Sequence, residues 1–200
     1  WGATLKSFDA TKARSIPGVV DIVALPNGVA VLGKHYWAAR QGRDALAIEW
    51  NEEKAFKKSS SDIIADYKAL ARKPGVSAVK RGNVDTAFKK AHKVLEATYE
   101  FPFLAHAAME PMNCVIQRTD SGVEVWNGCQ LQSVDQYTLS QVFGVKPEQV
   151  KINTLYAGGS FGRRANPMCD YTLETAMIVK AYGKPNPVKL VWSREDDMNA

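Results

Sequence analysis

Two turns divide the first fifty residues into short segments. They are Pro17-Gly18 and Pro26-Asn27-Gly28, and short apolar runs lie between and after them. Such runs, bounded by turn residues, are typical of strands. The pattern predicts strands at 19–24, 29–32 and 47–50 and helices at 10–15 and 35–46, the first helix capped by Asp9. Strands that alternate with helices over so short a stretch indicate a small layered α/β module.

The pattern weakens from Asn51 to about Asn83, where only a helix at 61–72 is predicted, and we interpret this stretch as a connection. Regular elements then return. We expect strands at 94–101, 113–118, 123–127, 149–155 and 187–193 and helices at 84–91, 132–143 and 170–182, the last two ending at Gly144 and Gly183. The chain is therefore predicted to belong to the α+β class.

Composition excludes several other classes. With 46% hydrophobic and 24% charged residues the chain is too apolar to be disordered, and it has no apolar run of the roughly 18 residues that a membrane-spanning helix needs. The net charge of +5 comes mainly from 54–93, where the basic residues are scattered over predicted helix and loop and the aromatic residues form no stacking platform. We interpret them as a solvated surface and predict no nucleic-acid partner.

Cysteine and histidine are few and dispersed. Cys114, Cys129 and Cys169 form no C-x-x-C pair, and their odd number does not suit a disulfide framework. His106 and Glu110 are four residues apart, but Pro111 argues against a continuous helix there. A capped turn explains this pair better than a metal site, so no metal ligand is predicted.

The segment 157–164 is the most informative for function. It places Gly158, Gly159 and Gly162 between a predicted strand and a predicted helix, followed by Arg163 and Arg164. Glycines allow a ligand to approach the backbone closely, and exposed N–H groups with arginines can bind phosphate or oxo groups. The segment matches neither the P-loop nor the dinucleotide fingerprint. On spacing alone, a plain glycine-rich turn explains it at least as well as a ligand-binding loop.

Taken together, several segments resemble the large, molybdenum-cofactor-binding subunit of the xanthine dehydrogenase and aldehyde oxidase family. Phe103–Pro111 is similar to the family's segment with His followed by Met-Glu-Pro, and Val125–Gln130 to its strand ending in Thr-Gln. Gly158–Arg164 is similar to its Gly-Gly-Gly-Phe-Gly-Gly-Lys loop, and Val188–Met198 to its strand followed by an Arg-Glu-Asp/Glu-Asp-Met run. Residues 16–40 resemble its α/β hammerhead domain. The resemblance covers nearly the whole chain.

Departures from the family pattern point to one branch. Leu104 stands where many members carry Gln, and Ser160, Arg163 and Arg164 replace Gly, Gly and Lys. Together with Cys129, these residues resemble the branch that contains the isoquinoline 1-oxidoreductase β-subunits, and they argue against a purine substrate. The resemblance implies a truncated hammerhead-like module at 1–60, a connection at 61–83 and the N-terminal part of a molybdopterin-binding domain at 84–200.

The resemblance also implies a cofactor site. The cofactor would be molybdenum–molybdopterin, alone or as a cytosine dinucleotide. The implied binding residues are Gln130, Gly158, Gly159, Ser160, Phe161, Gly162 and Arg163, with Arg164 and His106 as further candidates. Phe161 would shape the substrate side, Gln130 would lie beside the metal, and the arginines would neutralise cofactor phosphate or only bridge domains. For His106 and Glu110 the structural interpretation is preferred.

The implied activity belongs to a larger protein. Members of the family oxidise N-heteroaromatic compounds or aldehydes with oxygen from water and pass electrons to a 2Fe–2S subunit, in this branch with a cytochrome as a further acceptor. The family's catalytic glutamate would lie beyond Ala200, so we expect residues 1–200 alone to bind no cofactor and to be inactive. The branch implies a periplasmic or membrane-associated protein and leaves a cytoplasmic one open.

Two alternative functions stay open at this point. One is a phosphate- or nucleotide-binding module built on the glycine-rich segment, which would require that segment to lie at a helix N-terminus. The other is a non-catalytic domain that docks a redox partner through the basic stretch 54–93.

Overall fold

Residue contacts divide the protein into two compact units. The structure, a computed structural model, describes residues 1–199. Unit 1 comprises Trp1–Ala55 together with the chain from Ala105 onward, and unit 2 comprises Phe56–Leu104. This grouping differs from the expected boundaries at 60 and 83, and the division into hammerhead-like module, connection and cofactor-binding domain stays a prediction.

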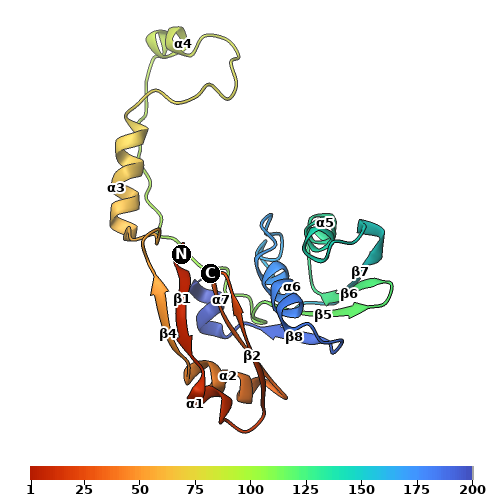
Figure 1. Ribbon diagram of the computed structural model, residues 1–200. Coiled ribbons are helices and arrows are strands. Elements are labelled where there is room, and N and C mark those ends of the chain that lie inside the picture. The colour runs from red at the N-terminus through yellow and green to blue at the C-terminus, as the bar shows by residue number, and fades with distance from the viewer. Residues whose placement is uncertain (200) are drawn as a thin grey trace. The chain divides into compact units, whose positions relative to one another are not determined.

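The N-terminal part of unit 1 contains two antiparallel strand pairs and two helices. β1 (Thr4–Asp9) pairs with β4 (Ala47–Asn51), and β2 (Val19–Leu25) forms a hairpin with β3 (Gly28–Gly33). α1 (Thr11–Arg14) packs on β2, and α2 (Tyr36–Asp44) packs on β3 and β2 (Figure 1). The predicted elements are confirmed to within two residues. The predicted cap is displaced by one residue, because Ala10 occupies the N-cap position of α1, although Asp9 Oδ1 accepts a hydrogen bond from Thr11 N at 2.8 Å. Strand β1 was not predicted.

The C-terminal part of unit 1 is a four-stranded sheet with the order β7-β6-β5-β8. Its strands are β5 (Asn113–Thr119), β6 (Gly122–Asn127), β7 (Val150–Thr154) and β8 (Val188–Val191). β5 is antiparallel to β6 and β8, whereas β6 and β7 are parallel. The parallel pair is connected through α5 (Gln132–Phe143) and the short 3-10 helix η1 (Pro147–Gln149). α6 (Asp170–Tyr182) precedes β8, and α7 (Arg194–Asn199) follows it.

The main core lies between this sheet and its helices. Alternating residues of β5 and β6 point into it, and Leu139 of α5 and Val179 of α6 meet them with no exposed surface. The buried members are Met112, Cys114, Ile116, Val123, Val125, Leu139, Val150, Tyr171, Ala176 and Val179. α5 and α6 begin where predicted and are capped at Gly144 and Gly183, each with a φ of 67°. Among the described residues, no helix has the length and apolar character needed to cross a bilayer.

Unit 2 contains α3 (Ser60–Ala71) and α4 (Val84–Lys90). A reciprocal capping box between Ser59 and Asp62 starts α3, and Asn83 Oδ1 accepts a hydrogen bond from Thr86 N at 2.9 Å to start α4. Both helices agree with the prediction. The predicted strand at 94–101 is wrong, because no strand forms there and unit 2 offers it no partner strand. Leu95 remains 83% exposed, so the apolar pattern alone does not create a strand.

Candidate cofactor-binding site

The carboxyl ends of β6 and β7 bring two of the predicted segments together. The strands are parallel with Asn127 opposite Thr154, and Leu155 N donates to Asn127 O at 2.9 Å where they end. Beyond β6 the chain continues to Gln130, and beyond β7 it enters the glycine loop, defined here as Gly158–Arg164. Because parallel strands end at the same edge of a sheet, Gln130 and the glycine loop become neighbours. This edge is also where α/β sheets commonly bind ligands.

Direct hydrogen bonds join Gln130 to the glycine loop. Ser160 Oγ donates to Gln130 Oε1 at 2.5 Å, and Gln130 N donates to Arg164 O at 3.2 Å. Ser160 Oγ also accepts from Arg164 N at 3.0 Å. Since Gln130 Oε1 is used by Ser160, its exposed Nε2 is left as a donor.

Three residues of the glycine loop adopt left-handed backbone conformations. Gly159, Phe161 and Gly162 have φ values of 98°, 55° and 97°, and the Phe161 side chain is 77% exposed. A Cβ added to Gly162 would meet no atom within 4 Å. Within residues 1–199, the backbone N–H groups of Gly159, Ser160, Phe161 and Gly162 donate no hydrogen bond. Successive free N–H groups in such a turn form a concave site for anionic oxygen or sulfur ligands.

Both arginines that follow point into the protein. The Arg163 side chain is 8% exposed, and its Nη2 donates to Asp170 Oδ2 at 2.7 Å while the guanidinium lies 5.3 Å from the Trp192 ring centre. The Arg164 side chain is 1% exposed, and its Nε donates to Gly159 O at 3.1 Å. Both guanidinium groups are engaged by protein groups, and their expected role in neutralising cofactor phosphate stays a prediction. These contacts favour a role in holding the glycine loop.

Glu110 anchors the start of the glycine loop from the segment before β5. Its Oε2 accepts from Gly158 N at 2.6 Å, and its own N donates to Gly158 O at 3.1 Å. Its Oε1 accepts from Asn113 Nδ2 at 2.6 Å and pairs with Arg164 Nη2 at 3.3 Å. The hydrogen bond from Asn113, followed by those from Gly158 and the charge of Arg164, holds the pKa of Glu110 below its ordinary value against the opposing effect of burial. The sequence indicated a structural Glu110, but it gave no signal for these partners or for Asn113.

His106 lies on the same segment but outside these contacts. Its side chain is exposed, and no helix forms around it, so it shares no helical face with Glu110. The neighbouring backbone is held instead by Arg194, whose Nη2 donates to Ala108 O and Met109 O at 2.5 and 2.9 Å. No group of three or more His, Cys, Asp and Glu residues in the described chain is arranged to hold a metal ion.

A buried polar layer lies in the core between α5 and α6. Asp135 Oδ1 accepts from Thr172 Oγ1 at 2.8 Å, and all three cysteines are buried free thiols. Burial is the main cause that raises the pKa of Cys114 to about 12 and that of Cys129 and Cys169 to about 11. Thiols with such values are poor nucleophiles and poor metal ligands at neutral pH.

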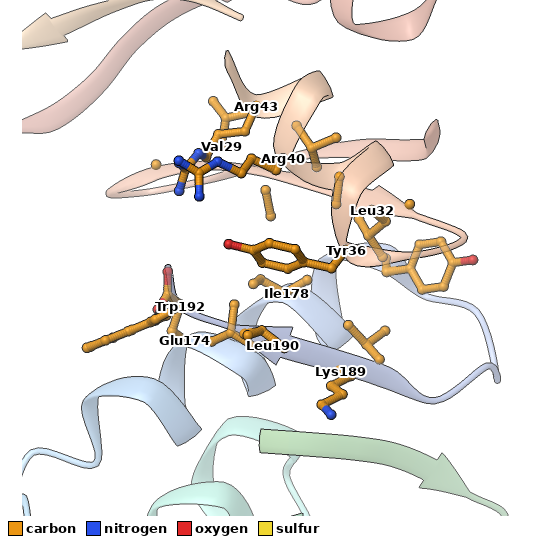
Figure 2. A pocket seen from close by; sticks show the side chains of 18 of the residues that line it. Val29, Leu32, Tyr36, Arg40, Arg43, Glu174, Ile178, Lys189, Leu190 and Trp192 are labelled. Carbon is orange, nitrogen blue, oxygen red and sulfur yellow. Dashed lines mark hydrogen bonds between the residues drawn. The ribbon is translucent and has the colours of Figure 1, made fainter. Parts of the chain in front are cut away.

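A separate cavity of about 1150 Å³ lies between the N-terminal strands and helices and the α6–β8 region (Figure 2). Tyr36 and Arg43 line one side, and Glu174 and Trp192 line the other. Two of its charged groups, Arg43 and Glu174, are engaged by protein partners, because Arg43 Nη1 donates to Asp196 at 2.8 Å and Glu174 Oε2 accepts from Trp192 Nε1 at 2.7 Å. The row of successive backbone N–H donors lies in the glycine loop, away from this cavity.

Comparison with known proteins decides the family. The family described as the molybdopterin cofactor-binding domain matches residues 69–200. This chain belongs to that family. It is 32% identical to the beta subunit of isoquinoline 1-oxidoreductase from Brevundimonas diminuta over 98% of this chain and 26% of the relative. It is 33% identical to a membrane-bound aldehyde dehydrogenase of Gluconacetobacter polyoxogenes, with 99% of this chain and 26% of the relative covered. The chain thus spans about a quarter of these relatives.

Solved structures confirm the fold of this molybdopterin-binding family. The aldehyde oxidoreductase of Desulfovibrio gigas gives a TM-score of 0.70 at 16% identity over 98% of this chain and 26% of that chain. Quinoline 2-oxidoreductase of Pseudomonas putida 86 gives 0.68 at 18% identity, covering 98% of this chain and 30% of that chain. The resemblance to the xanthine dehydrogenase and aldehyde oxidase family and the mixed α/β fold are therefore both confirmed.

The glycine loop and Gln130 fit a pterin–metal cofactor by their donor chemistry. The family's cofactor presents oxygen and sulfur atoms, and the four free N–H groups and the Gln130 amide are neutral donors that suit them. A nucleotide module fits less well, because α6 begins only at Asp170 and the free N–H groups do not lie at its N-terminus.

Proposed function

We propose that the glycine loop and Gln130 form part of the cofactor site of a molybdenum hydroxylase large subunit. The observation that carries this proposal is the row of unpartnered N–H groups from Gly159 to Gly162 beside the exposed amide of Gln130. Membership of the molybdopterin cofactor-binding family supports it.

The protein's own groups would bind and orient the cofactor. The loop N–H groups donate to its oxygen and sulfur atoms without adding charge, and Ser160 fixes the Gln130 amide so that Nε2 points outward as a donor. The exposed Phe161 ring shapes the neighbouring surface on the substrate side. When bound, the molybdenum centre supplies activation of water-derived oxygen and accepts the substrate's electrons.

The substrate class and partners of the whole protein are part of the same proposal. We expect an N-heteroaromatic compound or an aldehyde as substrate, which the names of the relatives support. The isoquinoline 1-oxidoreductase relative and a nicotinate dehydrogenase relative from Pseudomonas putida are each one subunit of an enzyme, which supports a multi-subunit assembly. We propose that a 2Fe–2S subunit and then a cytochrome accept the electrons. The cofactor would be molybdopterin or its cytosine dinucleotide form, and residues 1–200 alone would be inactive.

Molybdenum content tests the cofactor site directly. Gln130→Ala in the full-length protein removes the proposed amide donor and is expected to lower the molybdenum bound per chain, measured by elemental analysis, while the circular dichroism spectrum is unchanged. Gln141→Ala is the control, because Gln141 is an exposed glutamine on α5 that donates to Ser140 Oγ on its own helix. Full molybdenum content in Gln130→Ala would refute the proposed site.

A further inference from the structure

Glu110 is the residue that ties the two ends of the glycine loop to the rest of unit 1. It contacts Gly158 at the start of the loop through both its carboxylate and its backbone, at 2.6 and 3.1 Å. It contacts Arg164 at the end of the loop as well, where Nη2 lies 3.3 Å from Glu110 Oε1 and 3.3 Å from Glu110 O. The free N–H groups of residues 159–162 lie between these two anchors.

The contacts require an ionised carboxylate. Arg164 is almost fully buried and its Nη1 finds no hydrogen-bond partner within residues 1–199, so Glu110 is the carboxylate that balances its charge. A buried cation without its counter-ion is costly, and charge-assisted hydrogen bonds are about twice as strong as neutral ones. Asn113 fixes the carboxylate from its other side at 2.6 Å.

Glu110 is itself rigidly placed. Arg194 bonds the carbonyl oxygens of Ala108 and Met109 and is held in turn by Asp197 at 2.8 Å. Space around Glu110 is also tight, because a Cβ added to Gly158 would lie 2.6 Å from Glu110 Cβ. A fixed carboxylate in close contact determines where the glycine loop begins and ends.

We therefore propose that Glu110 is a positioning residue for the cofactor site, acting through Gly158 and Arg164 rather than by touching the cofactor. The claim that Glu110 affects cofactor binding rests on the proposed function. The claim that Glu110 fixes the position of the glycine loop depends only on the contacts described above. Loss of the Glu110 charge should free the Gly158 and Arg164 anchors and spread the loop over several conformations, which weakens cofactor retention.

The test compares Glu110→Gln with Glu124→Gln in the full-length protein. Glu124 is a matched control because its carboxylate also pairs with a cation and an asparagine, Lys151 at 2.7 Å and Asn153 at 3.1 Å, but on strands β6 and β7. Hydrogen exchange of the peptide containing Gly158–Arg164 is measured by mass spectrometry. Glu110→Gln is expected to speed exchange of the Gly158 amide by about tenfold to a hundredfold, whereas Glu124→Gln leaves it unchanged.

Molybdenum content of the same samples completes the test. Faster exchange together with reduced molybdenum in Glu110→Gln supports the proposal. Unchanged exchange overturns it, and so does faster exchange with full molybdenum. If Glu110→Gln does not fold, Asn113→Ala decides by the same criteria. This variant removes one hydrogen bond to Glu110 but leaves Arg164 paired with its carboxylate. Failure of the cofactor site itself is recognised separately, by full molybdenum in Gln130→Ala.

Discussion

Replacing Gly158 with alanine should destabilise the protein, because the added methyl group would clash with Glu110. The added Cβ would lie 2.6 Å from Glu110 Cβ and 3.2 Å from Glu110 Oε2. Carbon atoms normally approach to about 3.5–4.0 Å, so the shortfall is roughly 1 Å. The two residues cannot simply separate, because hydrogen bonds of 2.6 and 3.1 Å join them in both directions.

The expected loss follows from two opposing contributions. Overpacking at such a site lowers the free energy of unfolding by about 2–3 kcal/mol. Alanine also reduces the conformational freedom of the unfolded chain, which raises the free energy of unfolding by about 0.4–1 kcal/mol. The net loss of about 1–2.5 kcal/mol should lower the Tm by roughly 2–10 °C for a chain of this size.

Thermal unfolding followed by circular dichroism measures this loss, with Gly28→Ala as the control. A Cβ on Gly28, at the start of β3, would meet no atom within 4 Å, so this variant keeps the unfolded-state gain without the clash. It should raise the Tm by about 1–4 °C. Equal Tm values for the two alanine variants would refute the reasoning that the Glu110–Gly158 contact is rigid.

Two further predictions concern buried titratable groups. Glu174→Gln should stabilise the protein at pH 7 and reduce the pH dependence of its free energy of unfolding. Burial raises the pKa of Glu174, so its ionisation lowers the stability of the fold as pH rises above about 4.3. A glutamine does not ionise, and its side-chain oxygen can still accept the hydrogen bond from Trp192 Nε1. Urea unfolding at pH 4 and pH 7 measures it, and an equal loss of stability at both values would contradict it. The three thiols should react with a disulfide reagent at pH 8 only after denaturant is added, because burial raises their pKa values to about 11–12, and rapid labelling of the folded protein would contradict this.

Elements with local start and stop signals could be predicted from the sequence. Helix α6 begins at Asp170 and ends before Gly183 as expected, since glycine caps the helix in the left-handed conformation. Strand β1 could not be predicted, because a register shift between Leu5 and Ser7 breaks the alternation of inward and outward residues. The apolar run at 94–101 shows the converse, since a strand pattern without a partner forms no strand.

The candidate site could likewise be predicted only in part from the sequence. The sequence identifies the residue types of the glycine loop, and the parallel pairing of β6 with β7 explains why Gln130 lies beside it. It does not show where the charges of Arg163 and Arg164 are directed, because that depends on Asp170 and on Glu110, which lies 48 residues before Gly158. These carboxylates neutralise both arginines inside the fold. Under the proposed function, the attraction of the loop for an anionic ligand would come mainly from its free N–H dipoles, and the paired arginines would hold those dipoles in place.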